Sequence, residues 1–276
     1  MSRPEHIAPP ELFYGDTEAG KYTSNTRVQQ IQAEMTYRAL ELMALPEGQP
    51  SYLLDIGCGS GLSGEILDEE GHYWVGCDIA PSMLSIALER DLEGDLLLHD
   101  IGNGFGFKPG SFDGAISISV LQWLCNADTS SANPGSRLNK FFTSLYASLS
   151  RGSRAIFQFY PESDDQVSFI MGIAQKAGFT GGLVVDYPNS RKAKKFYLCL
   201  FAGVSPKQVN MPAAKTDEST VSYEGRQSLK HRPTRKNVKH SAKEYIQHKK
   251  DLQRSKGKEA VPFDSKYTGR KRKPRF

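Results

Sequence analysis

The feature that most constrains the fold is the alternation, between residues 51 and 202, of short apolar runs with segments of helical periodicity. Strands that alternate with helices favour right-handed crossovers and a mostly parallel sheet covered on both faces, which defines the α/β class. The last two apolar runs are linked only by the residues PNSRKAK, so we expect that pair to be antiparallel. We expect strands at residues 51–55, 73–77, 95–99, 112–119, 153–159, 181–187 and 195–202, and helices at 26–45, 61–70, 81–90, 136–150 and 164–177.

The charges divide the chain into an acidic body and a basic tail. Residues 1–205 hold 15 Lys and Arg against 24 Asp and Glu, a net charge of −9, whereas residues 206–276 hold 20 against 7, a net charge of +13. This asymmetry is typical of a nucleic-acid partner or a targeting segment, and less often of a tail that only keeps a protein soluble. Apolar residues thin out in the tail, so we expect it to be largely disordered apart from one helical pattern at 241–253.

Three regions follow from these patterns. We expect an extended N-terminal arm at residues 1–25, a folded domain at 26–205 and the basic tail at 206–276. No stretch of eighteen apolar residues predicts a membrane span, and the N-terminus lacks the apolar core of a secretory signal. The four cysteines form no CxxC pair and no Cys/His cluster, which argues against disulfides and an intrinsic metal site and favours an intracellular protein.

The stretch LLDIGCGSGLSGE, residues 53–65, ends a predicted strand and places four glycines within eight residues. A phosphate-binding loop requires GxxxxGK[ST], and no Lys or Thr follows these glycines. Counted from Gly57, the dinucleotide pattern GxGxxG fails, because its third glycine position is Leu62. The pattern DxGxGxG fits from Asp55 to Gly61 without a gap and is typical of S-adenosylmethionine-dependent methyltransferases.

Three acidic residues end three successive predicted strands, where ligands of open α/β sheets bind. Asp55 lies where a carboxylate steers the ammonium group of the cofactor, directly or through water. Asp78 is placed to accept both ribose hydroxyls, and Asp100 to accept from the adenine amino group, while Ile79 and Ile101 cover the adenine ring. A single aspartate of this kind is most often a solvated strand end or a helix cap, but three in phase favour the cofactor. We further expect side chains at positions 57, 59 and 61 to collide with the ligand.

Longer stretches carry a more specific resemblance. They are PPELFYGDTEAGKYTSNTRVQQIQAEMTYRALELM, FDGAISISVLQWLC, FQFYPES, GGLVVDYPNSRKAKKFYLCL and the terminal YTGRKRKPRF. Together with the glycine stretch they resemble the eukaryotic 18S ribosomal RNA guanine-N7 methyltransferase family, the bud-site-selection and Williams–Beuren-region methyltransferases. The resemblance runs from about residue 9 to residue 276 and is weakest in the tail. It implies a class I methyltransferase fold, with a Rossmann-like, seven-stranded, mostly parallel sheet whose last strand is antiparallel.

The resemblance also implies a role and partners. The expected protein is a nuclear enzyme, of nucleolus and nucleoplasm, that methylates one guanine of 18S rRNA and helps to build and export the pre-40S particle. It is expected to form a heterodimer with a small zinc-binding activator. We place that subunit on the predicted edge strand at 95–99, because three consecutive leucines on a sheet edge invite pairing with another chain. The cluster Arg270–Arg275 is typical of a nuclear localisation signal. The basic tail as a whole is typical of an RNA-binding segment.

The chemistry of such a reaction needs alignment more than acid–base catalysis. N7 of guanine carries a lone pair and no proton, so its attack on the sulfonium methyl requires no general base. Trp123 or Tyr160 is expected to stack on the base, and Gln122 or Glu162 to bond its N1 and N2 donors. The alternative for Trp123 is simple packing under the helix at 136–150. The expected cofactor residues are Tyr22, Arg27, Asp55, Gly57, Cys58, Gly59, Gly61, Asp78, Ile79, Met83, Asp100, Ile101 and Ser117, of which Tyr22 and Arg27 come from the resemblance.

Two other functions stay open on the sequence alone. One is a methyltransferase-fold ribosome assembly factor whose binding, rather than catalysis, is essential. The other is a small-molecule methyltransferase, which the fold alone allows. The basic tail argues against the second, because a metabolite enzyme has no need of it.

Overall fold

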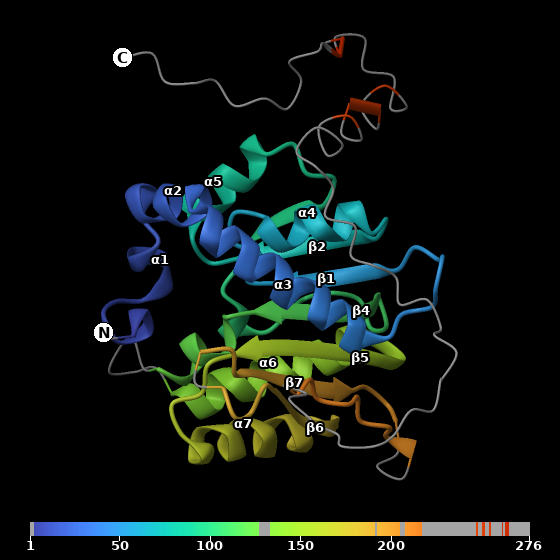
Figure 1. Ribbon diagram of the computed structural model, residues 1–276. Coiled ribbons are helices and arrows are strands. Elements are labelled where there is room, and N and C mark those ends of the chain that lie inside the picture. Colours follow the sequence, from blue (N-terminus) through green and yellow to red (C-terminus); the bar gives the residue numbers. More distant parts are fainter. Residues whose placement is uncertain are drawn as a thin grey trace, which may run out of the picture. The chain divides into compact units, whose positions relative to one another are not determined.

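The computed structural model describes residues 3–126, 133–190, 192–204 and 208–216, together with isolated residues between 247 and 264. Its centre is a seven-stranded sheet with the order β3-β2-β1-β4-β5-β7-β6 (Figure 1). The strands are β1 (Tyr52–Ile56), β2 (Tyr73–Asp78), β3 (Asp95–Leu98), β4 (Phe112–Ile118), β5 (Leu149–Phe159), β6 (Thr180–Asp186) and β7 (Lys195–Phe201). The helices are η1 (Pro4–His6), α1 (Pro10–Phe13), α2 (Asp16–Ser24), α3 (Thr26–Met43), α4 (Leu62–Glu69), α5 (Pro81–Glu89), η2 (Ile101–Asn103), η3 (Leu121–Cys125), α6 (Pro134–Ser148) and α7 (Asp164–Lys176).

Strand pairing confirms the expected α/β class and the antiparallel last strand. β1 to β5 pair in parallel, whereas β7 runs antiparallel to both β5 and β6. Every strand, and every helix expected between residues 26 and 177, is present, with ends shifted by a few residues. The start of β5 is shifted most, because Leu149 pairs with Phe112 across an irregularity in the register that the apolar pattern does not show.

Helices cover both faces of the sheet, and each face has its own apolar core. On one face α6 and α7 bury aromatic and aliphatic side chains against the sheet, among them Phe141, Phe142 and Ile170. On the other face α3, α4 and α5 contribute to a second core that includes Leu42 and Leu67. Figure 1 shows α3 lying across the strands on this second face. The strands are therefore rigid supports, and the loops at their carboxyl ends are held in place from both sides.

The N-terminal arm is helical, so the expectation of an extended arm is wrong. Its elements are η1, α1 and α2. α2 carries acidic residues in its first turn, where they complement the helix dipole. It buries only one small residue, Ala19, which packs against Ala80 and Met83 at the start of α5. Because the one fully buried side chain of α2 is a small alanine, the sequence of this helix shows little apolar periodicity, and the analysis of apolar periodicity did not predict it.

The tail begins later than the sequence indicates. The chain divides into two compact units, residues 1–219 and 220–276. Residues 208–216, here called the docked segment, belong to the first unit: Val209 packs on the core beneath α3, and the backbone of Lys215 bonds Tyr187 and Asp186. This part of the chain was assigned to the tail because it is poor in apolar residues. Hydrogen bonds hold it instead.

The docked segment is held by a buried ion pair. Arg38 of α3 donates two hydrogen bonds to the carboxylate of Asp186, at 2.7 and 3.0 Å, and a third to the carbonyl of Ala213. The side chains of Arg38 and Asp186 are only 7% and 3% exposed. The helical pattern at 241–253 lies outside the described residues, except for Gln247, Lys250 and Asp251, which are helical. Within the described part of the chain, no helix has the length and apolarity needed to cross a membrane.

Arg38→Ala is expected to destabilise the first unit strongly, because it leaves the Asp186 carboxylate buried and unpaired. Removing one partner of such a pair costs roughly 3–5 kcal/mol of unfolding free energy, measured by urea denaturation. The matched control is Arg90→Ala. Arg90 pairs with Glu65 nearer the surface, where the two side chains are 20% and 34% exposed. That change is expected to cost at most about 1 kcal/mol. Equal losses for the two variants would contradict this account of the docked segment.

Candidate functional site

The glycine stretch forms a tight loop between β1 and α4 at the carboxyl edge of the sheet. Gly57, Gly59 and Gly61 have φ angles of 73°, 54° and 76°, in the left-handed region that favours glycine. A Cβ at Gly57 would lie 2.2 Å from Val120, and one at Gly61 would lie 2.1 Å from Leu92. These two glycines therefore serve protein packing, and the expectation that side chains there would also meet the ligand stays a prediction. At Gly59 the nearest atom is the Met83 methyl at 3.1 Å, and both Gly57 and Gly59 line the cavity.

The fourth glycine of the stretch has a different role. Counted from Gly59 rather than Gly57, the sequence does contain GxGxxG, with Gly64 as the third glycine. A Cβ at Gly64 would lie 2.3 Å from the indole of Trp74, so this glycine lets α4 pack onto β2. The sequence therefore does contain the dinucleotide pattern, starting at Gly59, and the count from Gly57 was not sufficient to exclude it.

A cavity of about 240 Å³ opens beside this loop. It is bounded by the loops that follow β1, β2, β3 and β4, by the N-terminal arm and by α6. Of the expected site residues, those lining it are Tyr22, Gly57, Cys58, Gly59, Asp78, Ile79, Met83, Asp100, Ile101 and Trp123. Those outside its lining are Arg27, Asp55, Gly61, Ser117, Gln122, Tyr160 and Glu162.

Asp78 ends β2 and ties two loops together. Its carboxylate accepts from the backbone N–H of Gly59 and of Ala80, both at 2.8 Å. Burial raises the pKa of this carboxyl, and the backbone hydrogen bonds oppose that shift. A carboxylate offers about four acceptor positions, so two remain for hydroxyl groups of a ligand.

Asp55 is fully buried beneath the glycine loop. One carboxylate oxygen accepts from the hydroxyl of Ser63, and the other has no partner. Burial raises the pKa of Asp55 to about 7, the Ser63 hydrogen bond lowers it and the charge of Asp78 raises it further. A buried acceptor without a partner, next to a second acid, is complementary to a cationic group.

Asp100 follows β3 and is already fully engaged. Its oxygens accept two hydrogen bonds from Arg137 of α6, at 2.8 and 3.0 Å, one from the backbone of Gly102 and one from the Asn103 amide. The Arg137 guanidinium lies so close to Gly102 that a Cβ there would come within 2.4 Å of it. Asp100 therefore has no free acceptor position for an adenine amino group unless one of these bonds is given up. Its observed role is to hold the loop and Arg137 at the wall of the cavity.

Trp123 is presented to the cavity by η3, the short helix after β4. η3 buries Leu121 and Leu124 in the core beneath α6, which leaves Trp123 on the cavity side. Its ring lies 6.0 Å from Phe13 and 5.9 Å from Tyr14, both of the N-terminal arm. Trp123 thus packs against the arm and lines the cavity, rather than lying under α6.

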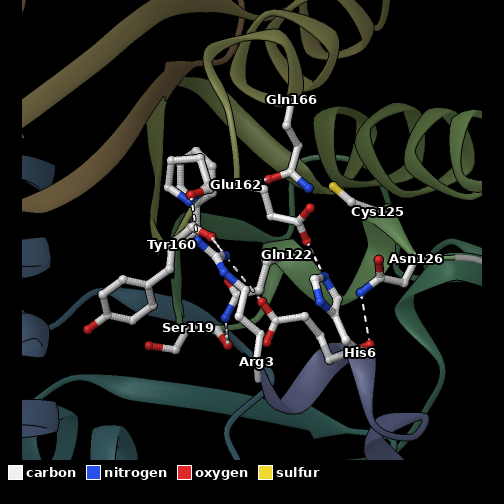
Figure 2. A network of polar contacts seen from close by, with 12 residues as sticks. Arg3, His6, Ser119, Gln122, Cys125, Asn126, Tyr160, Glu162 and Gln166 are labelled. Atoms are coloured by element: carbon white, nitrogen blue, oxygen red, sulfur yellow. Dashed lines mark hydrogen bonds and ion pairs between the residues drawn. The ribbon is translucent and has the colours of Figure 1, made fainter. Parts of the chain in front are cut away.

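The loop after β5 is closed by the N-terminal arm. Arg3 donates to the carbonyl oxygens of Tyr160 and Pro161, at 2.7 and 2.9 Å. Figure 2 shows His6 in contact with Glu162 at the same rim. Gln122 is only 6% exposed. Its side-chain amide N–H donates to the carbonyl oxygen of Ser119, and its side-chain carbonyl oxygen has no partner. Tyr160 and Glu162 are therefore held at the rim by other residues, outside the lining of the cavity.

Four expected cofactor residues lie outside the lining of the cavity, and several lining residues were not predicted. Of the four, Arg27 is exposed at the start of α3, and Ser117 is buried, with its hydroxyl donating to the carbonyl of Ile56. The lining residues that were missed include Tyr14, Ser119 and Arg137. The aromatic pair at the end of α1 was a usable signal for the first. The positive φ of Ser119, 64°, and the ion pair of Arg137 leave no mark in a local pattern.

The sheet order, the glycine loop and the cavity beside it define a class I S-adenosylmethionine-dependent methyltransferase. The methyltransferase domain family model matches residues 54–157. Among solved structures, phosphoethanolamine N-methyltransferase 2 of Haemonchus contortus, with S-adenosylhomocysteine bound, superposes with a TM-score of 0.53 at 19% identity, covering 69% of this chain and 58% of that one. Magnesium protoporphyrin IX methyltransferase of Synechocystis, with S-adenosylmethionine bound, gives 0.51 at 17% identity, covering 73% and 98%. These likenesses show the fold, and S-adenosylmethionine is the methyl donor of the class.

This chain belongs to the 18S rRNA (guanine-N(7))-methyltransferase family, as its motifs indicated. It is 57% identical to the Mus musculus member over 99% of this chain and 98% of that one. It is 56% identical to the Saccharomyces cerevisiae 18S rRNA (guanine(1575)-N(7))-methyltransferase over the full length of both. The model for the methyltransferase involved in Williams–Beuren syndrome matches residues 200–274, which include the basic tail.

Gly57→Ala is expected to cost about 2–4 kcal/mol of unfolding free energy, because the new Cβ collides with Val120 and the positive φ is strained. The measurement is urea denaturation. Gly71→Ala is the matched control: its φ is 80° but a Cβ there meets nothing within 4 Å, so only strain of about 1 kcal/mol applies. If both variants lose the same stability, close packing on Val120 is not the reason for the glycine.

Proposed function

We propose that this protein transfers the methyl group of S-adenosylmethionine to N7 of a guanine in 18S rRNA. The observation that carries the proposal is full-length identity above 50% to enzymes of that name, together with a cavity that joins the glycine loop to an aromatic rim. The role in pre-40S assembly, the nuclear location and RNA binding by the tail belong to the same proposal. The localisation cluster Arg270–Arg275 lies outside the described residues.

The residues present fit the cofactor. Asp55 lies beneath the glycine loop, outside the lining of the cavity, and the charge of its carboxylate favours a cationic group above that loop. Asp78 lines the cavity and has acceptor positions left for ribose hydroxyls. Ile79, Met83 and Ile101 supply apolar surface for a flat ring. When bound, the cofactor supplies an electrophilic methyl on sulfur. The chain orients it and excludes water from around it.

The side chains at the cavity suit a reaction without a general base. Burial raises the pKa of the Cys77 thiol to about 12 and that of Cys58 well above its ordinary value, so both stay protonated. Burial likewise raises the pKa of Tyr14 to about 12. Guanine N7 needs no proton removed, so alignment of the base with the methyl group is the task left to the chain.

Trp123 is the residue best placed to stack on the guanine, since it lines the cavity whereas Tyr160 does not. Neither Gln122 nor Glu162 lines the cavity, but Gln122 has an unpartnered carbonyl oxygen whereas Glu162 is paired with His6, so Gln122 is the better acceptor for the N1 and N2 donors if the base reaches η3. These assignments narrow the alternatives that the sequence left open.

Trp123→Ala is expected to lower kcat/KM for RNA methylation by about 10- to 100-fold, since a base–aromatic stack contributes roughly 1–3 kcal/mol. S-adenosylmethionine affinity, measured by calorimetry, is expected to change little. Tyr160→Phe keeps the ring and serves as the control, with near-normal turnover. Normal turnover of a folded Trp123→Ala variant would remove this side chain from the base pocket.

The affinity for S-adenosylmethionine is expected to fall on acidification. With a pKa of about 7 in the free protein, Asp55 is protonated at lower pH, and the proton competes with the cationic ligand group. With that pKa, about a tenth of the molecules carry a charged Asp55 at pH 6 and about nine tenths at pH 8, so binding at pH 6 is expected to be about tenfold weaker than at pH 8. In Asp55→Asn this pH dependence should vanish. A pH-independent wild-type affinity in calorimetric titrations would refute the role of Asp55.

The proposed activator subunit pairs with β3. This strand is an edge of the sheet, and it exposes Leu97 and Leu98 by 40% and 58%. An exposed apolar edge is a template for another strand. Leu97→Lys is therefore expected to abolish co-purification with the activator, whereas Phe169→Lys, at an exposed apolar site on α7, should leave it intact. Survival of the complex in Leu97→Lys would place the partner elsewhere.

The direct test of the reaction is transfer of a labelled methyl group. The full chain and its activator are incubated with labelled S-adenosylmethionine and either 18S rRNA or a metabolite pool. Label in the RNA, at a site cleaved after borohydride and aniline treatment, supports 7-methylguanine as the product. Label only in a metabolite refutes the proposal.

A further inference from the structure

The loop between β6 and β7 lies at the same edge of the sheet as the candidate active site. β6 ends at Asp186, which pairs with Lys195 at the start of β7. Phe196 in turn pairs with Phe159, the last residue of β5. The loop therefore lies next to Tyr160, at the rim where the N-terminal arm closes on the loop after β5. Residues 187–195 are called here the basic hairpin.

The basic hairpin concentrates positive charge in an otherwise acidic body. It carries Arg191, Lys192, Lys194 and Lys195 and no acidic residue. The rest of residues 1–205 holds 11 Lys and Arg against 24 Asp and Glu. More than a quarter of the positive charges of the body thus fall within nine consecutive residues. Such a concentration, with like charges side by side, costs electrostatic energy unless a polyanion binds there.

The described lysines of the hairpin point to solvent or to aromatic rings and not to acids. Lys192 and Lys194 are exposed, and the Lys194 ammonium lies 4.7 Å from the centre of the Phe196 ring. Lys195 donates to the hydroxyl of Tyr160 at 2.7 Å. Within the described residues, none of these three lysines has an acidic partner within ion-pair distance. The side chain of Arg191 lies outside the described residues.

The surroundings of Tyr160 leave one lysine without an acidic partner. Arg3 donates to the carbonyl oxygen of Tyr160 but is also paired with Glu5 at 3.3 Å, and Glu162 is paired with His6. Figure 2 shows the ring of Tyr160 directed away from the contact between His6 and Glu162. Among the described residues beside Tyr160, the cation without an acidic partner is therefore Lys195, which donates to the Tyr160 hydroxyl.

The described part of the docked segment ends beside the basic hairpin. The N–H of Tyr187, the first residue of the hairpin, donates to the carbonyl of Lys215 at 2.7 Å. This bond helps to hold the start of the hairpin in place at the rim.

We propose that the basic hairpin binds backbone phosphates of the RNA strand next to the target guanine. This inference rests on the proposed function. Lys192 and Lys194 neutralise phosphates as mobile point charges, and they position the strand without reading its sequence. The hairpin fixes where the strand crosses the rim, so that the target base falls at Trp123.

The test compares two double variants of the full chain. Lys192→Ala/Lys194→Ala removes two exposed charges of the hairpin. Lys108→Ala/Lys176→Ala is the matched control: both lysines are exposed, and they precede β4 and β6 at the opposite, amino-terminal edge of the sheet. Affinity for an unmodified 18S rRNA transcript is measured by filter binding between about 50 and 200 mM salt, and S-adenosylmethionine affinity by calorimetry.

The hairpin variant is expected to bind the RNA on the order of tenfold more weakly, with a salt slope lowered by about 1.5, since each phosphate contact contributes roughly 0.7–0.9. The control variant is expected to behave as wild type in every assay. An unchanged slope in the hairpin variant, or an equal loss in both variants, overturns the proposal. Unchanged RNA binding with loss of a protein partner also overturns it, in favour of a protein interface. If wild type methylates no RNA but the hairpin variant still loses RNA affinity, the proposed function fails and the docking surface stands.

Discussion

The close approach of the glycine loop to its neighbours is the constraint on which the site depends. Gly57 lies against Val120 so tightly that no side chain fits between the loops after β1 and β4. The N–H of Gly59 is held by Asp78, which joins the loop after β2 to the same surface. These contacts form one continuous floor from three separate loops. Beneath that floor, one oxygen of the Asp55 carboxylate is buried without a partner, which is unfavourable in the free protein. A nearby cation would relieve this unfavourable burial of charge.

The two sides of the cavity are built differently. The cofactor side comes from strand ends that two apolar cores hold in place. The opposite side comes from the N-terminal arm and the loops after β4 and β5, joined by Arg3, His6 and the rings around Trp123. A rigid cofactor side and a substrate side built from surface segments suit an enzyme that binds one small donor and one very large acceptor. The basic hairpin and the docked segment extend this second side along the edge of the sheet.

Local patterns were sufficient for the sheet and most of the cofactor side. The apolar runs located every strand, and the phase of Asp55, Asp78 and Asp100 located the correct edge. The patterns failed where long-range contacts decide the structure. α2 is anchored by Ala19, by the partly buried Tyr22 and by a hydrogen bond from Ser82 to Asp16, and the docked segment by the ion pair of Arg38 with Asp186, 148 residues away. The same limitation hid Arg137, whose bonds to Asp100 use the acceptor positions that the sequence assigned to adenine.

The structure also shows, as the sequence could not, which neighbours leave no room for a side chain at the glycines. A pattern of glycines indicates a close approach but not what approaches, and here protein side chains meet Gly57, Gly61 and Gly64. Gly59, where the nearest side-chain atom would lie 3.1 Å from a Cβ, is the least crowded of the four, and it lines the cavity together with Gly57. Similarly, the motif after β4 placed Gln122 and Trp123 at the rim, yet only the packing of η3 decides which side chain faces the cavity.

Amide hydrogen exchange with and without S-adenosylmethionine tests most directly whether these loops and the arm form one cofactor pocket. The account predicts that the cofactor slows exchange together in residues 10–22, 57–61, 78–83 and 100–102, with little change in α7. Protection limited to a single loop, or absent from the glycine loop, would contradict it.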